Sequence, residues 1–197
     1  MKLTGKISLG LLLLIAIVAV GMRINAKRQR DNEQTYHAGF KKTLTVSSSS
    51  FPPGGDMPIN CTCKGKEASP ALSWESSTTD AEAYAVLMTD PDVSSPNFPL
   101  YNLSHWVLYN LPASVRSLPE GVTTEQLRML GGKTGRNGTG SLAYIGPCPP
   151  IGRHAYIFRV YALDQPITLA DAPDKQTVME AMQGHILEYG ELIGYFQ

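Results

Sequence analysis

The sequence is poor in cysteine and only moderately charged. Three cysteines occur in 197 residues, Cys61, Cys63 and Cys148, and an odd number excludes complete pairing within one chain. A soft-metal site would also lack a fourth ligand at a recognised spacing. We expect at most one internal disulfide and at least one buried free thiol. With 43% hydrophobic and 17% charged residues, the composition indicates a globular fold rather than a disordered one.

The chain also lacks a basic surface pattern. The first 30 residues hold six of the 17 Lys and Arg and no acid, which leaves 11 basic against 17 acidic residues in the remainder. A body with this negative balance does not attract nucleic acid, and no basic stripe with interleaved aromatic residues occurs. We therefore exclude nucleic acid as a partner.

Motifs of common enzymes are incomplete or absent. Gly-Lys-Thr at 132–134 lacks the earlier glycine of a phosphate-binding P-loop, because position 127 is Leu. No Gly-x-Ser-x-Gly segment occurs, and Cys148 lies between prolines rather than at a helix start, where its thiol would be activated. We therefore predict no catalytic residue, no cofactor and no metal.

One long apolar run, residues 7–22, follows Lys2 and Lys6. This order is typical of an export signal, and Ala19-Val20-Gly21 offers a small-x-small cleavage site. The basic residues after the run favour an uncleaved anchor, since mature sequences rarely begin so basic. Charge flanks both sides of the run, so the positive-inside rule fixes no orientation, and no lipobox cysteine follows it.

These features divide the chain into three parts. We predict a signal anchor or signal peptide at 1–22, a basic and polar linker or juxtamembrane stem at 23–42, and one domain at 43–197. The domain is expected outside the cytoplasm, held to the membrane by residues 7–22. Cleavage, which would leave it periplasmic or secreted, is the alternative.

Short apolar or alternating runs separated by turn residues predict a mainly β domain. They lie at 44–46, 72–74, 84–89, 105–111 and 156–163. A helix is predicted from Asp174 to Gly190, which can stop it. Its apolar face holds Val178, Ala181, Met182, His185, Ile186 and Tyr189. Strands followed by a packing helix indicate a β domain closed by one helix, with His185 in its core or at its rim.

Polar residues lie where two of these strands end or begin. Asp90 and Asp92 flank Pro91 directly after the strand at 84–89, and His105 opens the next strand. Two carboxylates can serve acid–base chemistry or bind a cation. Asp-Pro-Asp is equally a good turn sequence, and an isolated histidine at a strand end is usually a half-buried polar residue.

The segment 146–156 is the most informative. It reads Gly-Pro-Cys-Pro-Pro-Ile-Gly-Arg-His-Ala-Tyr, and its prolines and glycines restrict a loop to one irregular shape. Such a loop can present His154 and Tyr156 to a ligand with little ordering cost. The alternative is a structural turn before a strand.

Taken in order, these segments resemble the phosphatidylethanolamine-binding protein family, and most closely its bacterial Raf-kinase-inhibitor-like branch. The motifs are Cys63-Lys64-Gly65, Ser69-Pro70-Ala71-Leu72-Ser73-Trp74, Asp90-Pro91-Asp92-Val93, the run from His105 to Pro112, Gly146-Pro147-Cys148-Pro149-Pro150 and His154-Ala155-Tyr156. The resemblance implies a compact β-sandwich around a large sheet, with a C-terminal helix beside an anion pocket. The implied pocket residues are Asp90, Asp92, His105, Gly146, Pro149, Pro150, His154 and Tyr156.

The resemblance implies a non-enzymatic protein that binds a small anion or a phospholipid head group and modulates a partner protein. Imidazole and phenol groups can donate to phosphate oxygens, and the aspartates can orient and charge the histidines. We predict that anion affinity rises as pH falls through the histidine range. The family's usual His-Arg-Tyr is His154-Ala155-Tyr156 here, which removes a cation beside the pocket.

Two other functions remain open at this point. One is inhibition of a protease or kinase through the pocket or another surface. The other is hydrolysis by the Asp90, Asp92, His105 and His154 cluster.

Overall fold

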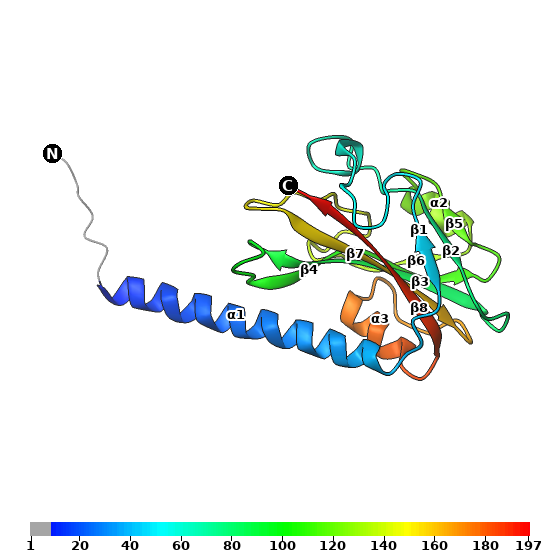
Figure 1. Cartoon of the computed structure of the whole chain (residues 1–197). Coiled ribbons are helices and arrows are strands. Elements are labelled where there is room, and N and C mark those ends of the chain that lie inside the picture. The colour runs from blue at the N-terminus through cyan, green and yellow to red at the C-terminus, as the bar shows by residue number, and fades with distance from the viewer. Residues whose placement is uncertain (1–8) are drawn as a thin grey trace.

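The computed structural model describes residues 9–197, and it has two antiparallel sheets and three α-helices (Figure 1). Lys2, Lys6 and the first two residues of the apolar run lie outside the described residues. The large sheet has the order β6-β4-β3-β7-β8. Its strands are β3 (Ala83–Val93), β4 (Tyr101–Pro112), β6 (Lys133–Thr134), β7 (His154–Leu163) and β8 (Ile186–Phe196). The mainly β prediction is therefore confirmed.

The small sheet has the order β1-β2-β5. It contains β1 (Thr45–Ser47), β2 (Leu72–Glu75) and β5 (Ser117–Leu118). Between the sheets lies a core that includes Trp74 and Phe51 with Tyr84, Trp106 and Phe158 of the large sheet. Because side chains alternate across a strand, the two sheets enclose one face of β3, β4 and β7.

A second core lies on the other face of the large sheet. α3 (Lys175–Met182) buries Val178 and Met182 against Leu87, Tyr109 and Tyr161. α2 (Thr124–Met129) lies separately, and its N-terminus is closed by a Thr123–Gln126 capping box. β3, buried on both faces, is the central strand on which the site is built.

α1 (Leu9–Ala38) is one continuous helix that includes most of the segment expected as a linker or stem. By length and composition it is able to cross a membrane. Its last turns pack on the sheet, where Tyr36 donates to the Met179 carbonyl at 2.7 Å and Glu33 pairs with Arg159 and Lys175. The end of α1 is thus part of the folded domain, which local sequence polarity did not indicate.

The predicted C-terminal helix begins correctly but ends early. Asp174 accepts from the Thr177 N–H at 2.8 Å as its cap, yet the helix stops at Met182 and Gly184 turns the chain with φ +87°. Residues 186–196 then pair with β7 as β8. Gly190 is therefore no helix stop; it lies inside β8, where a Cβ would come within 2.0 Å of the Leu44 carbonyl oxygen. His185 is not a core residue either, because it pairs with Asp164 in a partly exposed turn.

Candidate functional site

The ends of three adjacent strands bring Asp90, His105 and His154 together. His154 opens β7, and its Nδ1 donates to Asp90 Oδ2 on β3 at 2.8 Å, with side-chain exposures of 0% and 3%. Asp90 Oδ1 accepts from the Asp92 backbone N–H at 2.8 Å. His154 Nε2 faces the Ile151 carbonyl oxygen at 3.2 Å. Both ring nitrogens of His154 thus face oxygen atoms of the protein, Asp90 Oδ2 and the Ile151 carbonyl oxygen.

His105 lies in β4 with one nitrogen bonded and the other free. Its Nδ1 donates to the Ile145 carbonyl at 2.8 Å, while the Ile145 N–H donates to the His105 carbonyl at 3.1 Å. Nε2 is buried and has no hydrogen-bond partner within residues 9–197. Burial lowers the pKa of His105, opposed by the bond to Ile145 and the charge of Asp90. The neutral ring therefore keeps an unused acceptor at Nε2.

Tyr156 packs behind the two histidines. Its ring meets the His105 ring edge-on at a centroid distance of 5.3 Å and stacks on His154 at 6.4 Å. The hydroxyl interacts electrostatically with Asp90 but makes no hydrogen bond of ordinary geometry with any described residue. Burial and the charges of Asp90 and Asp92 raise its pKa, so it stays a neutral donor.

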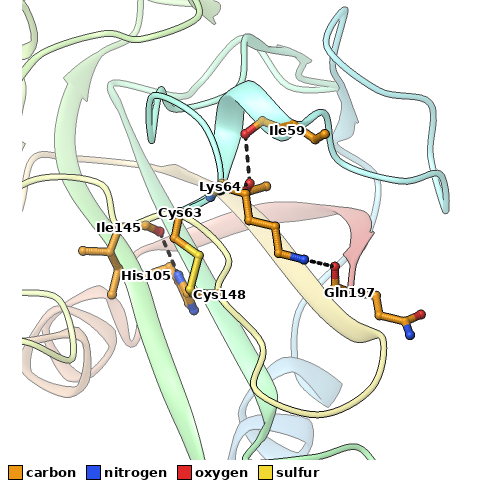
Figure 2. Close-up of a disulfide and its surroundings, with 8 residues drawn as sticks. Ile59, Cys63, Lys64, His105, Ile145, Cys148 and Gln197 are labelled. Carbon is orange, nitrogen blue, oxygen red and sulfur yellow. Dashed lines mark hydrogen bonds between the residues drawn. A yellow bond between two sulfur atoms is a disulfide. The ribbon is translucent and has the colours of Figure 1, made fainter.

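The proline-rich loop is fixed to the segment at 61–65. A disulfide joins Cys63 to Cys148, and the Cys63 N–H donates to the Pro147 carbonyl at 3.1 Å. Figure 2 shows this disulfide beside the His105 ring and Ile145. Gly146 permits the approach, since a Cβ there would lie 2.9 Å from the Thr62 carbonyl carbon. Cys61 is the remaining thiol, and burial raises its pKa to about 11, which confirms the expected buried free cysteine.

These groups surround a cavity of about 170 Å³. It is lined by Asp90, Val93, Leu103, His105, Ile145, Gly146, Cys148, Pro149, Pro150 and His154. Asp90, His105 and His154 are buried, whereas Cys148 and Pro150 at the other side are exposed. At ~30 Å³ per water the volume equals that of roughly five or six water molecules, which is room for a small head group.

Two of the expected pocket residues do not line this cavity. Asp92 Oδ2 accepts from the Ala155 N–H at 2.9 Å and so joins the end of β3 to β7. Tyr156 lies behind the histidines, as described above. Ala155 does not line the cavity, and strand alternation directs its side chain to the opposite face from His154 and Tyr156. The absent arginine therefore leaves no gap in the wall.

The helix expected beside the pocket lies elsewhere. α3 packs on the opposite face of the large sheet, and none of its residues lines the cavity. Sequence reasoning missed Val93, Leu103, Ile145 and Cys148, which supply apolar wall or backbone rather than a recognisable functional group. Within residues 9–197, no group of three or more His, Cys, Asp or Glu side chains is arranged to hold a metal.

Two larger cavities, of about 430 and 590 Å³, lie along the polar half of α1. Most of their charged side chains are paired with one another, as Glu33 is with Arg159 and Lys175 and Arg159 is with Glu191. The smaller cavity instead combines the unpartnered imidazole nitrogen with the residues expected from the family resemblance. We therefore take the smaller cavity as the candidate site.

Comparison with known proteins identifies relatives that are similar in sequence and in fold. The family model for phosphatidylethanolamine-binding protein matches residues 47–197. A UPF0098 protein of Methanothermobacter thermautotrophicus is 37% identical over 154 residues, which cover 78% of this chain and 99% of the relative. The crystal structure described as a homolog of that family, CT736 from Chlamydia trachomatis, matches with TM-score 0.71 and 31% identity, covering 80% of this chain and 99% of that one.

The structure of E. coli YbcL has the same fold, with TM-score 0.69 and 24% identity over 78% of this chain and 98% of that one. The chain therefore belongs to the phosphatidylethanolamine-binding protein family, in the branch of the bacterial and archaeal UPF0098 proteins. The resemblance stated from the sequence is confirmed.

Proposed function

We propose that this protein is a non-enzymatic binding protein whose cavity holds a small phosphate-bearing or other anionic group, such as a phospholipid head group. The observation that carries the proposal is the buried, unpartnered Nε2 of His105 in the cavity wall. A buried polar atom without a partner costs free energy that a ligand's hydrogen bond recovers. The buried His154–Asp90 hydrogen bond beside it holds two polar side chains of the cavity wall in place.

The protonation states define which ligand fits. Neutral His105 offers an acceptor, so an anion binds there when it brings its own proton, as a protonated phosphate does, or when the ring takes up a proton. Tyr156 supplies a neutral hydroxyl behind the ring. Both routes require a proton, and affinity for phosphate should therefore rise as pH falls.

The arrangement of potential nucleophiles supports binding rather than hydrolysis. Cys148 is held in the disulfide, and the raised pKa of Cys61 keeps that thiol protonated. Ser104 Oγ makes no hydrogen bond to any described residue, so it forms no dyad with His105. Both Asp90 oxygens are engaged, which leaves no free carboxylate base in the cavity wall.

We propose that α1 anchors the domain to a membrane, with the domain outside the cytoplasm. The apolar half of α1 and the Cys63–Cys148 disulfide support this location, because disulfides persist in oxidising compartments. Release by cleavage after residue 21 is the alternative. No feature of the described surface favours a particular protease, kinase or other protein partner.

Binding can be tested on the full chain in detergent micelles by calorimetric titration with phosphoethanolamine at pH 6. We expect saturable binding, a loss of at least about tenfold in affinity for His105→Ala, and no change for His185→Ala, which alters a histidine in a turn outside the cavity. Equal affinity in all three proteins, or no saturable binding by the wild type, would contradict the proposal. Thermal unfolding of each variant checks that the fold is retained.

A further inference from the structure

The turn between β3 and β4 lies against the apolar half of α1. Leu100 and five helix residues together line an apolar hollow; these are Leu14, Ile15, Val18, Ala19 and Met22. The Arg23 guanidinium lies 4.6 Å from the centre of the Phe98 ring. In Figure 1 this turn (green) and the loop before β7 (yellow) lie at the end of the sheet nearest the N-terminal half of α1.

Two segments at this end of the sheet carry no charge. Residues 93–103 and 137–152 contain no Asp, Glu, Lys, Arg or His, although 17% of the chain is charged. They approach one another, since a Cβ on Gly152 would lie 3.2 Å from Pro96 Cδ. We call residues 94–101 and 148–152 the rim surface, because they continue from the exposed side of the cavity at Cys148 and Pro150.

Large apolar side chains are exposed on the rim surface. Phe98, Tyr101 and Ile151 are 41%, 40% and 66% exposed. Exposed large apolar side chains grouped on a charge-free surface mark a contact with another protein or a membrane. Tyrosine is enriched at the membrane–water interface, and arginine near the end of a membrane helix reaches to it. Tyr101 is exposed on the rim surface, and Arg23 at the end of the apolar run lies over the Phe98 ring.

The position of Leu100 along α1 indicates how deep the turn between β3 and β4 would lie in a bilayer that holds α1. Leu100 faces the helix between Leu14 and Met22, which spans about 12 Å at ~1.5 Å per residue. If residues 7–22 lie in the hydrocarbon, Leu100 therefore lies beside the second half of the span, inside the hydrocarbon near its boundary with the head groups. A bilayer that holds α1 would thus also cover the rim residues.

We propose that the rim surface is embedded in the same bilayer that holds α1, so that the cavity opens at the level of the lipid head groups. The ligand is then the phosphate-bearing head group of a bilayer lipid, taken up laterally, rather than a free ion from solution. This inference rests on the proposed ligand binding and anchoring. It adds the source of the ligand and the face through which it enters.

Depth-dependent quenching tests the placement directly. The full chain is placed in nanodiscs of phosphatidylethanolamine and phosphatidylglycerol, with bromine on the acyl chains near the head groups. Single variants Phe98→Trp and Ile151→Trp report on the rim, and Met129→Trp at the far end of the domain, 69% exposed before substitution, is the control. The native Trp74 and Trp106 are buried and supply a constant background.

We expect brominated lipid to quench the added tryptophan at 98 and 151 at least about threefold more strongly than that at 129. Equal quenching at all three positions would overturn the inference. Phe98→Asp provides the second arm: it should weaken transfer of a fluorescent phosphatidylethanolamine from the nanodisc at least about fivefold and leave affinity for soluble phosphoethanolamine unchanged. Unchanged lipid transfer would also overturn it.

The two proposals fail in different ways. Strong quenching at 98 and 151 without binding of soluble phosphoethanolamine would support the rim placement and reject the proposed ligand site. Saturable phosphoethanolamine binding without preferential quenching would retain the ligand site and reject the embedded rim.

Discussion

The buried His154 ring donates to the Asp90 carboxylate at 2.8 Å and so joins the first residue of β7 to the end of β3. This contact fixes the floor of the cavity. Both side chains are almost fully buried, with exposures of 0% for His154 and 3% for Asp90. Removal of one partner leaves the other buried and unpaired.

Asp90→Asn tests that contact. We expect a loss of about 1–3 kcal/mol in the free energy of unfolding, the usual cost of leaving a buried polar group without its hydrogen-bond partner. The matched control is Asp164→Asn, which breaks the exposed His185–Asp164 pair and should cost less than about 1 kcal/mol. Urea unfolding of the full chain in micelles measures both values. Similar losses in the two variants would show that the buried Asp90–His154 contact contributes no more to the free energy of unfolding than the exposed His185–Asp164 pair.

Loss of the disulfide should loosen the proline-rich wall. Its 85-residue separation predicts a loss of about 4–5 kcal/mol in stability for the double change Cys63→Ala and Cys148→Ala. Affinity for phosphoethanolamine should fall too, because Pro149 and Pro150 are no longer held beside His105. Dithiothreitol should reproduce both effects in the wild type and have none on the double variant. A reduced wild type with full affinity would argue that the loop is held by its other contacts.

The pH dependence of binding follows from His105. Its pKa is lowered by burial, so at neutral pH the free site holds the ring unprotonated, and an anion at Nε2 favours the protonated form. Binding should therefore be accompanied by proton uptake, and affinity should rise as pH falls from neutral toward the lowered pKa of the free His105 ring. Calorimetry in two buffers of different ionisation enthalpy measures the uptake. His105→Gln should abolish it, and uptake that persists in this variant would assign the proton to another group.

His105 also affects stability in the absence of ligand. Because its folded-state pKa lies below the unfolded value, the unfolded chain binds more protons as pH falls through about 6.5. The ligand-free protein should lose stability in that range, and His105→Gln should lose less. A steeper loss in the variant would contradict the assignment.

Glu188 should govern stability in acid. Burial of the carboxyl opposes its ionisation, but hydrogen bonds from Ser76, Ser77 and Thr43 outweigh burial and lower its pKa to about 2. This stabilisation is complete above the ordinary value near 4.5 and is lost as pH falls toward 2. Glu188→Gln should flatten the stability profile between these values, as measured by urea unfolding at successive pH. An unchanged slope would place the acid-sensitive contact elsewhere.

Sequence patterns identified the strands better than the chain ends. The apolar runs at 84–89 and 105–111 lie within β3 and β4 because alternation and apolar content act locally. The packing of Glu33 against Arg159 and Lys175 joins residues more than 120 positions apart, so the polar composition of 23–42 gave no sign of it. The helical periodicity after Met182 was overridden by Gly184 and by pairing of β8 with β7.

In the site, too, the sequence identified some features, while others depend on contacts between distant residues. Family resemblance marked Asp90, His105 and His154, whereas their protonation states depend on partners such as Ile145 and Ile151 that offer only a backbone carbonyl. Nor could spacing choose between Cys61 and Cys63 as the partner of Cys148. That choice follows from the approach of Gly146 to the backbone at 61–63, which no sequence pattern expresses.

The most direct test of the central claim is the 15N chemical shift of His105 Nε2 in the full chain, measured during titration with phosphoethanolamine at pH 7. The account predicts an unprotonated Nε2 in the free protein and a saturable shift toward the protonated, hydrogen-bonded value as the ligand binds. A His105 Nε2 signal that stays unchanged at saturating phosphoethanolamine, or that is already protonated without it, would contradict the account.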